Sequence, residues 1–286
     1  MAVELVETIS ELRGRVADRR AAGALGLVPT MGALHAGHAS LIAEARRSCA
    51  TVVASIFVNP LQFDRTDDLA SYPRPLEADL DMCADLGVDM VFAPSVPEMY
   101  PGPARCAVDV GRLADHLCGS GRPGHFRGVA TVVLKLFQII QPDVAFFGEK
   151  DAQQLAIVRR MVADFNVPVR VVGVPTVRET DGLALSSRNR RMTPAERHLA
   201  PALYRVLLDV QARVRAGVPD TETIVTRAAA GLPADERLRL EYLALVDPDE
   251  CQPVDRVTGP VIAAGALWVG STRLIDNVRC VPQGQV

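Results

Sequence analysis

Two histidines lie three residues apart in the segment 29–38, where a strand-like run passes directly into a helical pattern. We expect His35 and His38 to share one face of the first helical turn, where free backbone N–H groups and the helix dipole favour an anion. Gly32 and Gly37 would let a phosphate or a flat ring approach the backbone closely. The segment is therefore a candidate phosphate site, while so short a pattern also fits two surface histidines on an ordinary turn.

Two amide side chains follow the next strand-like run. Asn59 and Gln62 stand where the chain leaves that run, and amides bind hydroxyl and carboxylate groups without adding charge. Asn59 precedes a proline and also fits a turn role. Gln62 lies between two apolar residues, which a turn role explains less well. We therefore expect a neutral polar contact with a ligand at this position.

Basic side chains gather in two further loops. A glycine-flanked loop before a helical pattern contains Arg122, His125 and Arg127. It favours an anion and also fits solvated surface charge. Later in the chain, Ser186, Ser187 and Arg188 follow a glycine-bearing turn. Their hydroxyls and guanidinium predict a loop that closes over phosphates.

Another strand-like run ends in a charged segment. Lys150 is a point charge that suits a triphosphate, and Asp151 could cap the helix that follows. Gln154 lies one helical turn further on, beside Asp151. This segment therefore predicts a third group of ligand contacts.

The elements that position these residues alternate along the first two-thirds of the chain. We expect strands at 24–29, 51–58, 89–93, 143–147 and 167–172 and helices at 38–48, 75–86, 128–140 and 152–166. Near-continuous apolar strands joined by helices predict an α/β domain with a doubly wound, Rossmann-like parallel sheet. Ligands then bind beyond the carboxyl ends of the strands, where most of the residues named above stand.

The pattern changes after residue 176, so we expect a first domain at 1–176 and a smaller C-terminal α+β domain at 177–286. Thr193 and Pro194 predict the start of one long helix, 194–216. A helix at 221–231 and strands at 239–246, 261–269 and 272–280 complete the expectation.

Composition narrows the class of protein. The 286 residues carry a formal charge of −3, so no overall basic field favours nucleic acid or a membrane surface as a partner. The six cysteines are scattered without a C-x-x-C pair, which predicts reduced, mostly buried thiols rather than zinc or disulfides. The first 16 residues lack a signal-peptide pattern and no apolar run is long enough to span a bilayer. We therefore expect a soluble, cytoplasmic protein.

The motifs together resemble one family. VPTMGALHAGH at 28–38, SIFVNPLQF at 55–63, YPR at 72–74, RPGHFRGV at 122–129, FFGEKD at 146–151 and GLALSSRN at 182–189 are similar to pantoate–β-alanine ligases, the pantothenate synthetases. These belong to the HxGH nucleotidyltransferase superfamily, which also contains the class I aminoacyl-tRNA synthetases. The resemblance implies that ATP and pantoate form a pantoyl adenylate with release of pyrophosphate, and that β-alanine then displaces AMP.

The resemblance also implies roles for individual residues. His38 would be the general acid and His35 a phosphate partner, with Lys150 and Arg188 as further catalytic cations. Pantoate and β-alanine would meet Gln62, Gln154 and Asn59. The ATP site would comprise Met31, Gly32, Ala33, Leu34, His35, Ala36, Gly37, His38, Gly148, Glu149, Lys150, Asp151, Val177, Leu185, Ser186, Ser187 and Arg188.

Further expectations concern the metal, the assembly and the departures from the family pattern. Mg²⁺ would bridge the ATP phosphates, with Asp79 a candidate for its neighbourhood. The resemblance also implies a homodimer. From the serine-bearing loop we expect the C-terminal domain to act as a lid. Ala36 stands where an acid is usual, Ala152 where an aromatic residue is usual, and residues 190–192 also depart from the family pattern. These departures put local packing and loop behaviour in doubt more than activity.

Two other functions compete with this interpretation. A regulatory nucleotide-binding module would keep the fold and lose turnover, which the intact His38, Lys150 and Arg188 argue against. A nucleotidyltransferase acting on a phosphorylated acceptor is the closer alternative. The neutral pair Gln62 and Gln154 favours a hydroxy acid over a phosphate.

Overall fold

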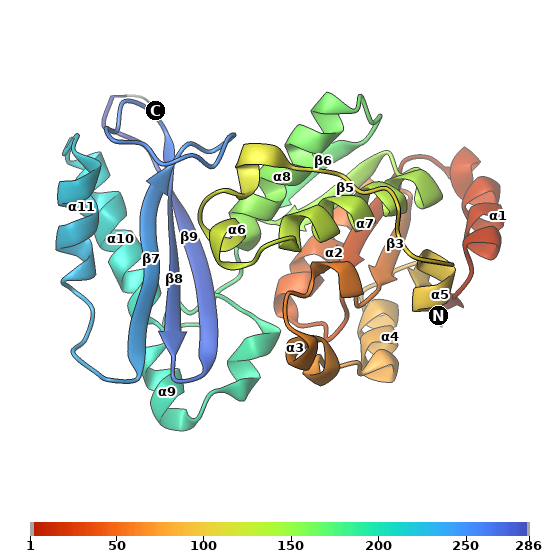
Figure 1. Cartoon of the computed structure of the whole chain (residues 1–286). Coiled ribbons are helices and arrows are strands. Elements are labelled where there is room, and N and C mark those ends of the chain that lie inside the picture. The colour runs from red at the N-terminus through yellow and green to blue at the C-terminus, as the bar shows by residue number, and fades with distance from the viewer. Residues whose placement is uncertain (1–2, 285–286) are drawn as a thin grey trace. The chain divides into compact units, whose positions relative to one another are not determined.

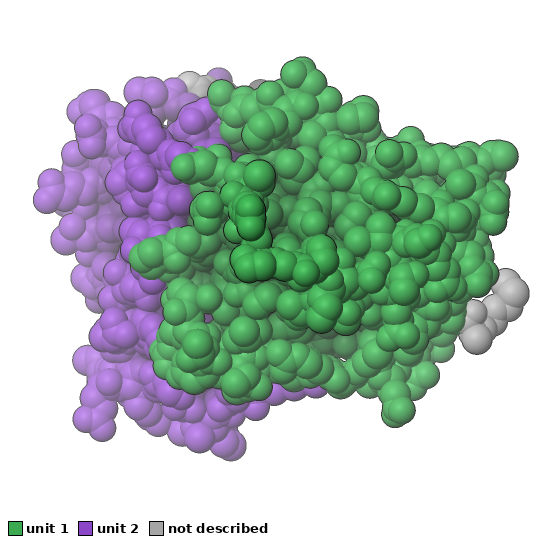
Figure 2. Space-filling model, turned by 45° about the vertical axis from the view of Figure 1, so that its right-hand side comes forward, with its two compact units in different colours: residues 1–110, 122–149, 157–175 green, residues 111–121, 150–156, 176–286 purple. Residues whose placement is uncertain are grey.

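The structure, a computed structural model, describes residues 3–284 and divides into two compact units, shown in two colours in Figure 2. The first unit runs to Val110 and includes residues 122–149 and 157–175. The second comprises residues 111–121, 150–156 and the chain from Thr176 onward. Two short segments that precede residue 177 thus belong by their contacts to the second unit.

The first unit is built on a six-stranded sheet in the order β1-β4-β3-β2-β5-β6, in which every pair of neighbours is parallel. Its strands are β1 (Glu4–Val6), β2 (Leu25–Thr30), β3 (Thr51–Ile56), β4 (Met90–Phe92), β5 (Val144–Gly148) and β6 (Arg170–Val174). From β2 the chain continues outward through β3 and β4, and from β5 it continues outward to β6, while β1 lies at the edge beside β4. β2 and β5 therefore flank the switch point of the sheet. The predicted doubly wound α/β fold is confirmed.

Helices cover both faces of this sheet (Figure 1). They are α1 (Ile9–Arg19), α2 (Ala36–Ser48), α3 (Thr66–Ser71), α4 (Leu76–Asp85), α5 (Val96–Met99), α7 (His125–Ile140) and most of α8 (Ala152–Asp164). On one face, α2 and α4 share an apolar cluster with β2, β3 and β5 through residues such as Ile42, Val28 and Phe146. On the other face, Phe137 of α7 meets Phe147 of β5 edge to face. Burial on both faces explains why the strands are almost wholly apolar.

The second unit is an antiparallel sheet in the order β7-β8-β9 with helices packed on it. Its strands are β7 (Leu238–Val246), β8 (Val261–Val269) and β9 (Thr272–Cys280), and its helices are α6 (Cys118–Gly121), α9 (Pro194–Leu199), α10 (Ala202–Arg215) and α11 (Thr221–Ala229). Gly270, with φ of 57°, makes the tight turn between β8 and β9, and a Cβ at this position would overlap the Glu196 carboxylate. The predicted strands 261–269 and 272–280 match β8 and β9 residue for residue.

A buried ion pair fastens the segment after β6 to the second unit's sheet. Arg178 donates to both carboxylate oxygens of Asp276 at 2.5 and 3.0 Å, and its guanidinium stacks on the Tyr204 ring at 3.8 Å. The Asp276 side chain is 5% exposed. The two opposite charges of Arg178 and Asp276 are therefore tolerated in the interior only while they remain paired.

Several predicted boundaries are wrong for local reasons. The long helix 194–216 breaks into α9 and α10 because Pro201 lacks an N–H and its ring clashes with the preceding turn. The predicted Thr193 cap is confirmed, and Glu196 completes a capping box with it at the start of α9. The strand predicted at 167–172 lies at β6, later in the chain, beyond Pro168. β1 and α1 were not predicted. β1 is only three residues long, and α1 is rich in charged residues and buries only Leu12 and Val16.

Asp276→Ala is expected to lower the free energy of unfolding by about 3–5 kcal/mol, since it leaves the Arg178 guanidinium unpaired in a mostly buried setting. Asp67→Ala is the matched control, because the Arg65–Asp67 ion pair is largely exposed and its loss should cost less than about 0.5 kcal/mol. Urea denaturation measures both variants. Equal losses would contradict a structural role for the buried pair.

Candidate functional site

The segment after β2 bends sharply and is held by a buried carboxylate from α4. Gly32 and Ala33 have φ of 78° and 52°, in the left-handed region. Asp79, 3% exposed, accepts hydrogen bonds from the Ala33 and Leu34 amides at 2.8 and 2.7 Å. A Cβ on residue 32 would lie 2.9 Å from an Asp79 carboxylate oxygen, so this glycine is required by both conformation and space.

Asp79 also affects Cys83, which lies one helical turn further along α4. Burial, with the Asp79 charge adding to it, raises the pKa of the Cys83 thiol to about 12. Cys83 therefore remains a neutral core residue. Of the six cysteines, all of which are free, only Cys106 is exposed.

His35 and His38 cap the start of α2 through each other. His35 Nδ1 accepts from the Gly37 amide at 3.1 Å, and His38 Nδ1 accepts from the His35 amide at 3.3 Å. The ring centroids are 4.2 Å apart. Because a backbone N–H can only donate, both neutral rings must carry their proton on Nε2. The caps thereby provide a pair of Nε2–H donors at the N-terminus of a helix.

The expectation of free backbone N–H groups in this segment is wrong for most of it. The amides of Ala33 and Leu34 bond to Asp79, and that of Gly32 bonds to Thr30 Oγ1 at 3.1 Å. The His38 amide bonds to the His35 carbonyl at 2.8 Å. Donors for an anion are therefore the imidazole Nε2–H groups more than the backbone. His35 is the residue before α2, so the helix begins two residues earlier than the predicted 38–48.

Gln62 and Asn59 form one buried amide cluster beyond β3. Gln62 is 8% and Asn59 1% exposed. Asn59 Nδ2 donates to Gln62 Oε1 and to the Gly128 carbonyl, each at 3.1 Å, while its Oδ1 accepts from the Tyr100 hydroxyl at 2.9 Å and the Leu61 amide at 3.3 Å. With both donors and both acceptor positions bonded, Asn59 is equipped to position Gln62 rather than to contact a ligand itself.

The amide cluster reaches the histidine-bearing segment. Gln62 Nε2 lies 3.0 Å from Met31 Sδ, a weak acceptor that a better one can replace. Gly148 ends β5, the strand next to β2, and Glu149 follows it in the short helix η4 (Glu149–Asp151). The first unit thus brings residues 31–38, Gln62 and Gly148 to the carboxyl ends of β2, β3 and β5, where the sequence predicted them.

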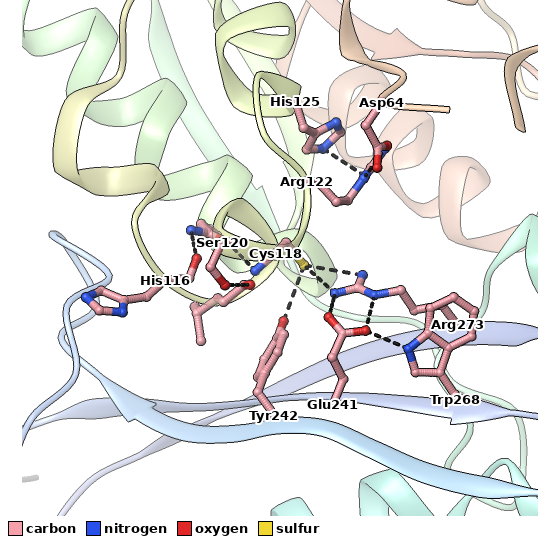
Figure 3. A network of polar contacts seen from close by, with 12 residues as sticks. Asp64, His116, Cys118, Ser120, Arg122, His125, Glu241, Tyr242, Trp268 and Arg273 are labelled. Atoms are coloured by element: carbon pink, nitrogen blue, oxygen red, sulfur yellow. Dashed lines mark hydrogen bonds and ion pairs between the residues drawn. The ribbon is translucent and has the colours of Figure 1, made fainter. Parts of the chain in front are cut away.

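The basic loop before α7 contributes to this cluster instead of presenting free charge. Arg122 Nε bonds to Asp64 at 3.2 Å (Figure 3). His125, 9% exposed, contacts the Gln62 carbonyl through Nδ1 at 2.7 Å. Arg127 is exposed. α7 begins at His125, three residues before the predicted start, because Gly124 with φ of 79° ends the preceding turn.

The second unit holds the remaining predicted site residues in two places. The Lys150 carbonyl accepts from Asn277 Nδ2 at 2.8 Å, and Lys150 Nζ lies 3.8 Å from Asp151. Gln154, half-buried on α8, makes no side-chain hydrogen bond within residues 3–284. It therefore retains its full bonding capacity for a ligand.

The serine loop is held by a short two-stranded contact. The Leu185 amide bonds to the Val177 carbonyl at 3.0 Å, which brings two predicted nucleotide-site residues together. Ser186 Oγ accepts from the Arg188 amide at 3.2 Å and caps η5 (Ser187–Arg191). The geometry thus pairs Val177 with the beginning of the loop that carries Ser187.

A polar network in the second unit was not predicted. Glu241 accepts from Arg273 at 2.7 and 2.9 Å and from the Trp268 indole at 2.7 Å (Figure 3). The Arg273 hydrogen bonds lower the pKa of Glu241 below its ordinary value. Tyr242 contacts Cys118 of α6 at 3.3 Å. The network joins α6 to the sheet, and no local sequence pattern marks it because its members are far apart in the chain.

No group of three or more histidine, cysteine, aspartate or glutamate side chains that could hold a metal ion occurs between residues 3 and 284. Asp79, the sequence candidate, already accepts two backbone hydrogen bonds. Its burial is therefore explained by the bend at Ala33, and this geometry gives a metal role no support. In the same described part of the chain, no helix is long and apolar enough to cross a membrane.

The fold and this edge of its sheet define an α/β protein of the doubly wound class, which binds ligands at the switch point. A family model for pantoate–beta-alanine ligases matches residues 4–279. The chain therefore belongs to the pantoate–beta-alanine ligase family.

Individual relatives agree over nearly the full length. A pantothenate synthetase of Moorella thermoacetica is 49% identical over 96% of this chain and 98% of its own length. The crystal structure of pantothenate synthetase from Thermus thermophilus has a TM-score of 0.90 at 46% identity, covering 96% of this chain and 99% of that chain. The pantoate–beta-alanine ligase of Francisella tularensis, solved with beta-gamma ATP and beta-alanine, has a TM-score of 0.80 at 33% identity and covers 97% of both chains.

Asp79→Asn is expected to loosen the bend at Ala33, because the new NH₂ group faces a backbone N–H and leaves a buried donor unsatisfied at a cost of about 1–3 kcal/mol. The melting temperature should fall and the KM for ATP should rise. Asp81→Asn on the exposed side of α4 is the control and should change neither. A fully stable Asp79→Asn protein with unchanged ATP kinetics would contradict the anchoring role.

Proposed function

We propose that this chain condenses pantoate with β-alanine to form pantothenate, at the expense of ATP, through an enzyme-bound pantoyl adenylate. Family membership over residues 4–279 supports the overall reaction. The single feature that best supports the chemistry is the histidine pair at the start of α2, whose capping bonds through Nδ1 place both ring protons on Nε2.

The reaction proceeds in two displacements. A carboxylate is a poor electrophile, so one carboxylate oxygen of pantoate first attacks the α-phosphorus of ATP and pyrophosphate leaves. The neutral amine of β-alanine then attacks the acyl carbon, AMP leaves with that oxygen, and the nitrogen loses a proton as the amide forms. No covalent bond to the protein is required.

The proposed catalytic groups offset negative charge. Pantoate and ATP are both anions, and further charge develops on the α-phosphate and on pyrophosphate in the transition state. His38 acts as donor to the developing charge and His35 as phosphate partner, each through Nε2–H. Lys150 and Arg188 supply cations. Preorganised donors of this kind are effective because they need no rearrangement during the reaction.

The nucleotide and metal complete the proposal. The ATP site comprises residues 31–38 and 148–151 with Val177, Leu185 and Ser186 to Arg188. Mg²⁺ bound together with ATP would offset the charge of its phosphates, and it would require few protein ligands because it keeps several waters. A homodimer and a cytoplasmic location are also part of the proposal.

Neutral amides select the acid. Gln62 and Gln154 bind the hydroxyl and carboxylate groups of pantoate, and Asn59 supports Gln62. A phosphorylated acceptor would bring about two negative charges, whereas Gln62 and Gln154 are neutral and the nearby Arg122 is already paired with Asp64. This contrast favours the ligase over a transferase acting on a phosphorylated acceptor.

Pantoate-dependent exchange of labelled pyrophosphate into ATP, with β-alanine absent, tests the proposal. The first displacement needs no amine and is reversible while its products remain bound, so exchange is expected. Gln154→Ala should weaken it by about 1–3 kcal/mol in transition-state stabilisation. A regulatory module would bind ATP without exchange, and exchange that strictly requires β-alanine would contradict the adenylate.

His38→Ala is expected to slow adenylate formation by about a hundredfold or more, the scale of a lost preorganised donor. His38→Asn is the matched variant, because its Oδ1 can still accept from the His35 amide while the Nε2–H donor is gone. Both variants should be slow in single-turnover experiments, and His38→Asn should melt like the unmodified chain. Near-normal turnover of His38→Asn would contradict the catalytic role and leave His38 with only a helix-capping role.

The proposal assigns nucleotide and pantoate binding to residues 1–176 and a lid function to residues 177–286. Amide hydrogen exchange in residues 178–191 should therefore slow on addition of ATP. Amides in the β8–β9 hairpin serve as the internal control and should not change. Unchanged exchange at saturating ATP would contradict a lid that orders on nucleotide.

A further inference from the structure

The segment that carries Gln62 is clamped against the start of α7. It forms a single 3-10 turn, η2 (Pro60–Gln62), that packs on α7 at Gly128. A Cβ on residue 128 would overlap the Leu61 carbonyl, so only glycine allows this approach. The orientation of Gln62 therefore depends on neighbours that belong to other elements.

One set of contacts fixes the side-chain amide of Gln62. The Tyr100 hydroxyl donates to Asn59 Oδ1, and Asn59 Nδ2 donates to Gln62 Oε1. Burial raises the pKa of Tyr100 to about 12, so its hydroxyl remains a donor at neutral pH. The bond from Asn59 Nδ2 to the Gly128 carbonyl fixes which end of the Asn59 amide is the donor. Hydrogen bonds therefore run from Tyr100 through Asn59 to Gln62. Gln62 is thereby left with Nε2 as its outward donor.

A second set fixes the main chain of Gln62. His125 Nδ1 lies 2.7 Å from the Gln62 carbonyl. His125 Nε2 lies 3.1 Å from Arg122 Nη1 (Figure 3). A carbonyl only accepts and a guanidinium only donates, so His125 must be neutral with its proton on Nδ1. Arg122 is itself fixed by Asp64 and also donates to the Gln62 carbonyl at 3.3 Å.

We propose that His125 and Tyr100 are positioning residues that hold Gln62, from its main chain and its side chain respectively, in the orientation that binds pantoate. The proposal rests on the proposed function, in which Gln62 contacts the acid. Neither residue is required to touch a substrate. Both act through Gln62, so their loss should affect pantoate far more than ATP.

Steady-state kinetics of three variants test this. Tyr100→Phe removes one oxygen, and His125→Leu removes the closer of the two donors to the Gln62 carbonyl. Each should raise the KM for pantoate by about fivefold or more, as expected when a buried partner is lost. His125→Asn places an amide nitrogen near the former Nδ1 and should return the KM to within about twofold of the unmodified chain. The KM for ATP should stay nearly constant throughout.

Tyr242→Phe is the matched control. It removes another largely buried tyrosine hydroxyl, one that contacts Cys118 instead of the amide cluster. It should leave the KM for pantoate unchanged even if it lowers the melting temperature. Unchanged pantoate KM in both Tyr100→Phe and His125→Leu would overturn the proposal, as would a parallel rise in both KM values or a failure of His125→Asn to rescue. If His125→Leu does not fold, Tyr100→Phe and His125→Asn still decide the outcome.

Pyrophosphate exchange and the steady-state kinetics together separate this inference from the proposed function. Absence of pantoate-dependent pyrophosphate exchange in the unmodified chain would defeat the function itself. Normal exchange in the unmodified chain, with no effect of Tyr100→Phe or His125→Leu on pantoate, would defeat only the positioning roles.

Discussion

The buried carboxylate of Asp79 sets the shape of the segment that carries both histidines. An alanine in the left-handed region costs about 1–2 kcal/mol, and Ala33 adopts that conformation with φ of 52°. Each hydrogen bond from a buried amide to a charged acceptor contributes about 1.5–3 kcal/mol, so the two bonds to Asp79 offset the strain. Because the bend decides where α2 begins, the positions of His35 and His38 follow from this one contact.

The rest of the proposed site is ordered in the same manner, by internal bonds made before any ligand binds. The histidines cap each other's backbone, and Gln62 is held at its amide and its carbonyl. Such preorganisation matters most for a reaction between two anions, because donors that are already aligned need not be collected at the moment charge develops. The polar groups that look available in the sequence are thus largely engaged with one another.

Local signals explain what the sequence could predict. Apolar runs bounded by turn residues indicated the parallel sheet, and the strands of the C-terminal hairpin were predicted closely because Gly270 and Ser271 separate two strand-like runs there. The H-x-G-H spacing indicated the histidine pair. The residues that hold the site in place could not be predicted from local sequence. Asp79 lies 46 residues from Ala33, and Tyr100 lies 41 residues from Asn59. Only tertiary structure shows that these residues meet, and only it shows that the Asn59 amide is fully bonded to other protein groups.

The fate of the pantoate carboxylate oxygens tests the central claim most directly. Pantoate labelled with a heavy oxygen isotope in its carboxylate is turned over with ATP and β-alanine, and the products are examined by mass spectrometry. An acyl adenylate predicts that each AMP carries one labelled oxygen and each pantothenate retains the other in its amide carbonyl. Unlabelled AMP, with the isotope in pyrophosphate or inorganic phosphate, would contradict attack at the α-phosphorus and with it the proposed mechanism.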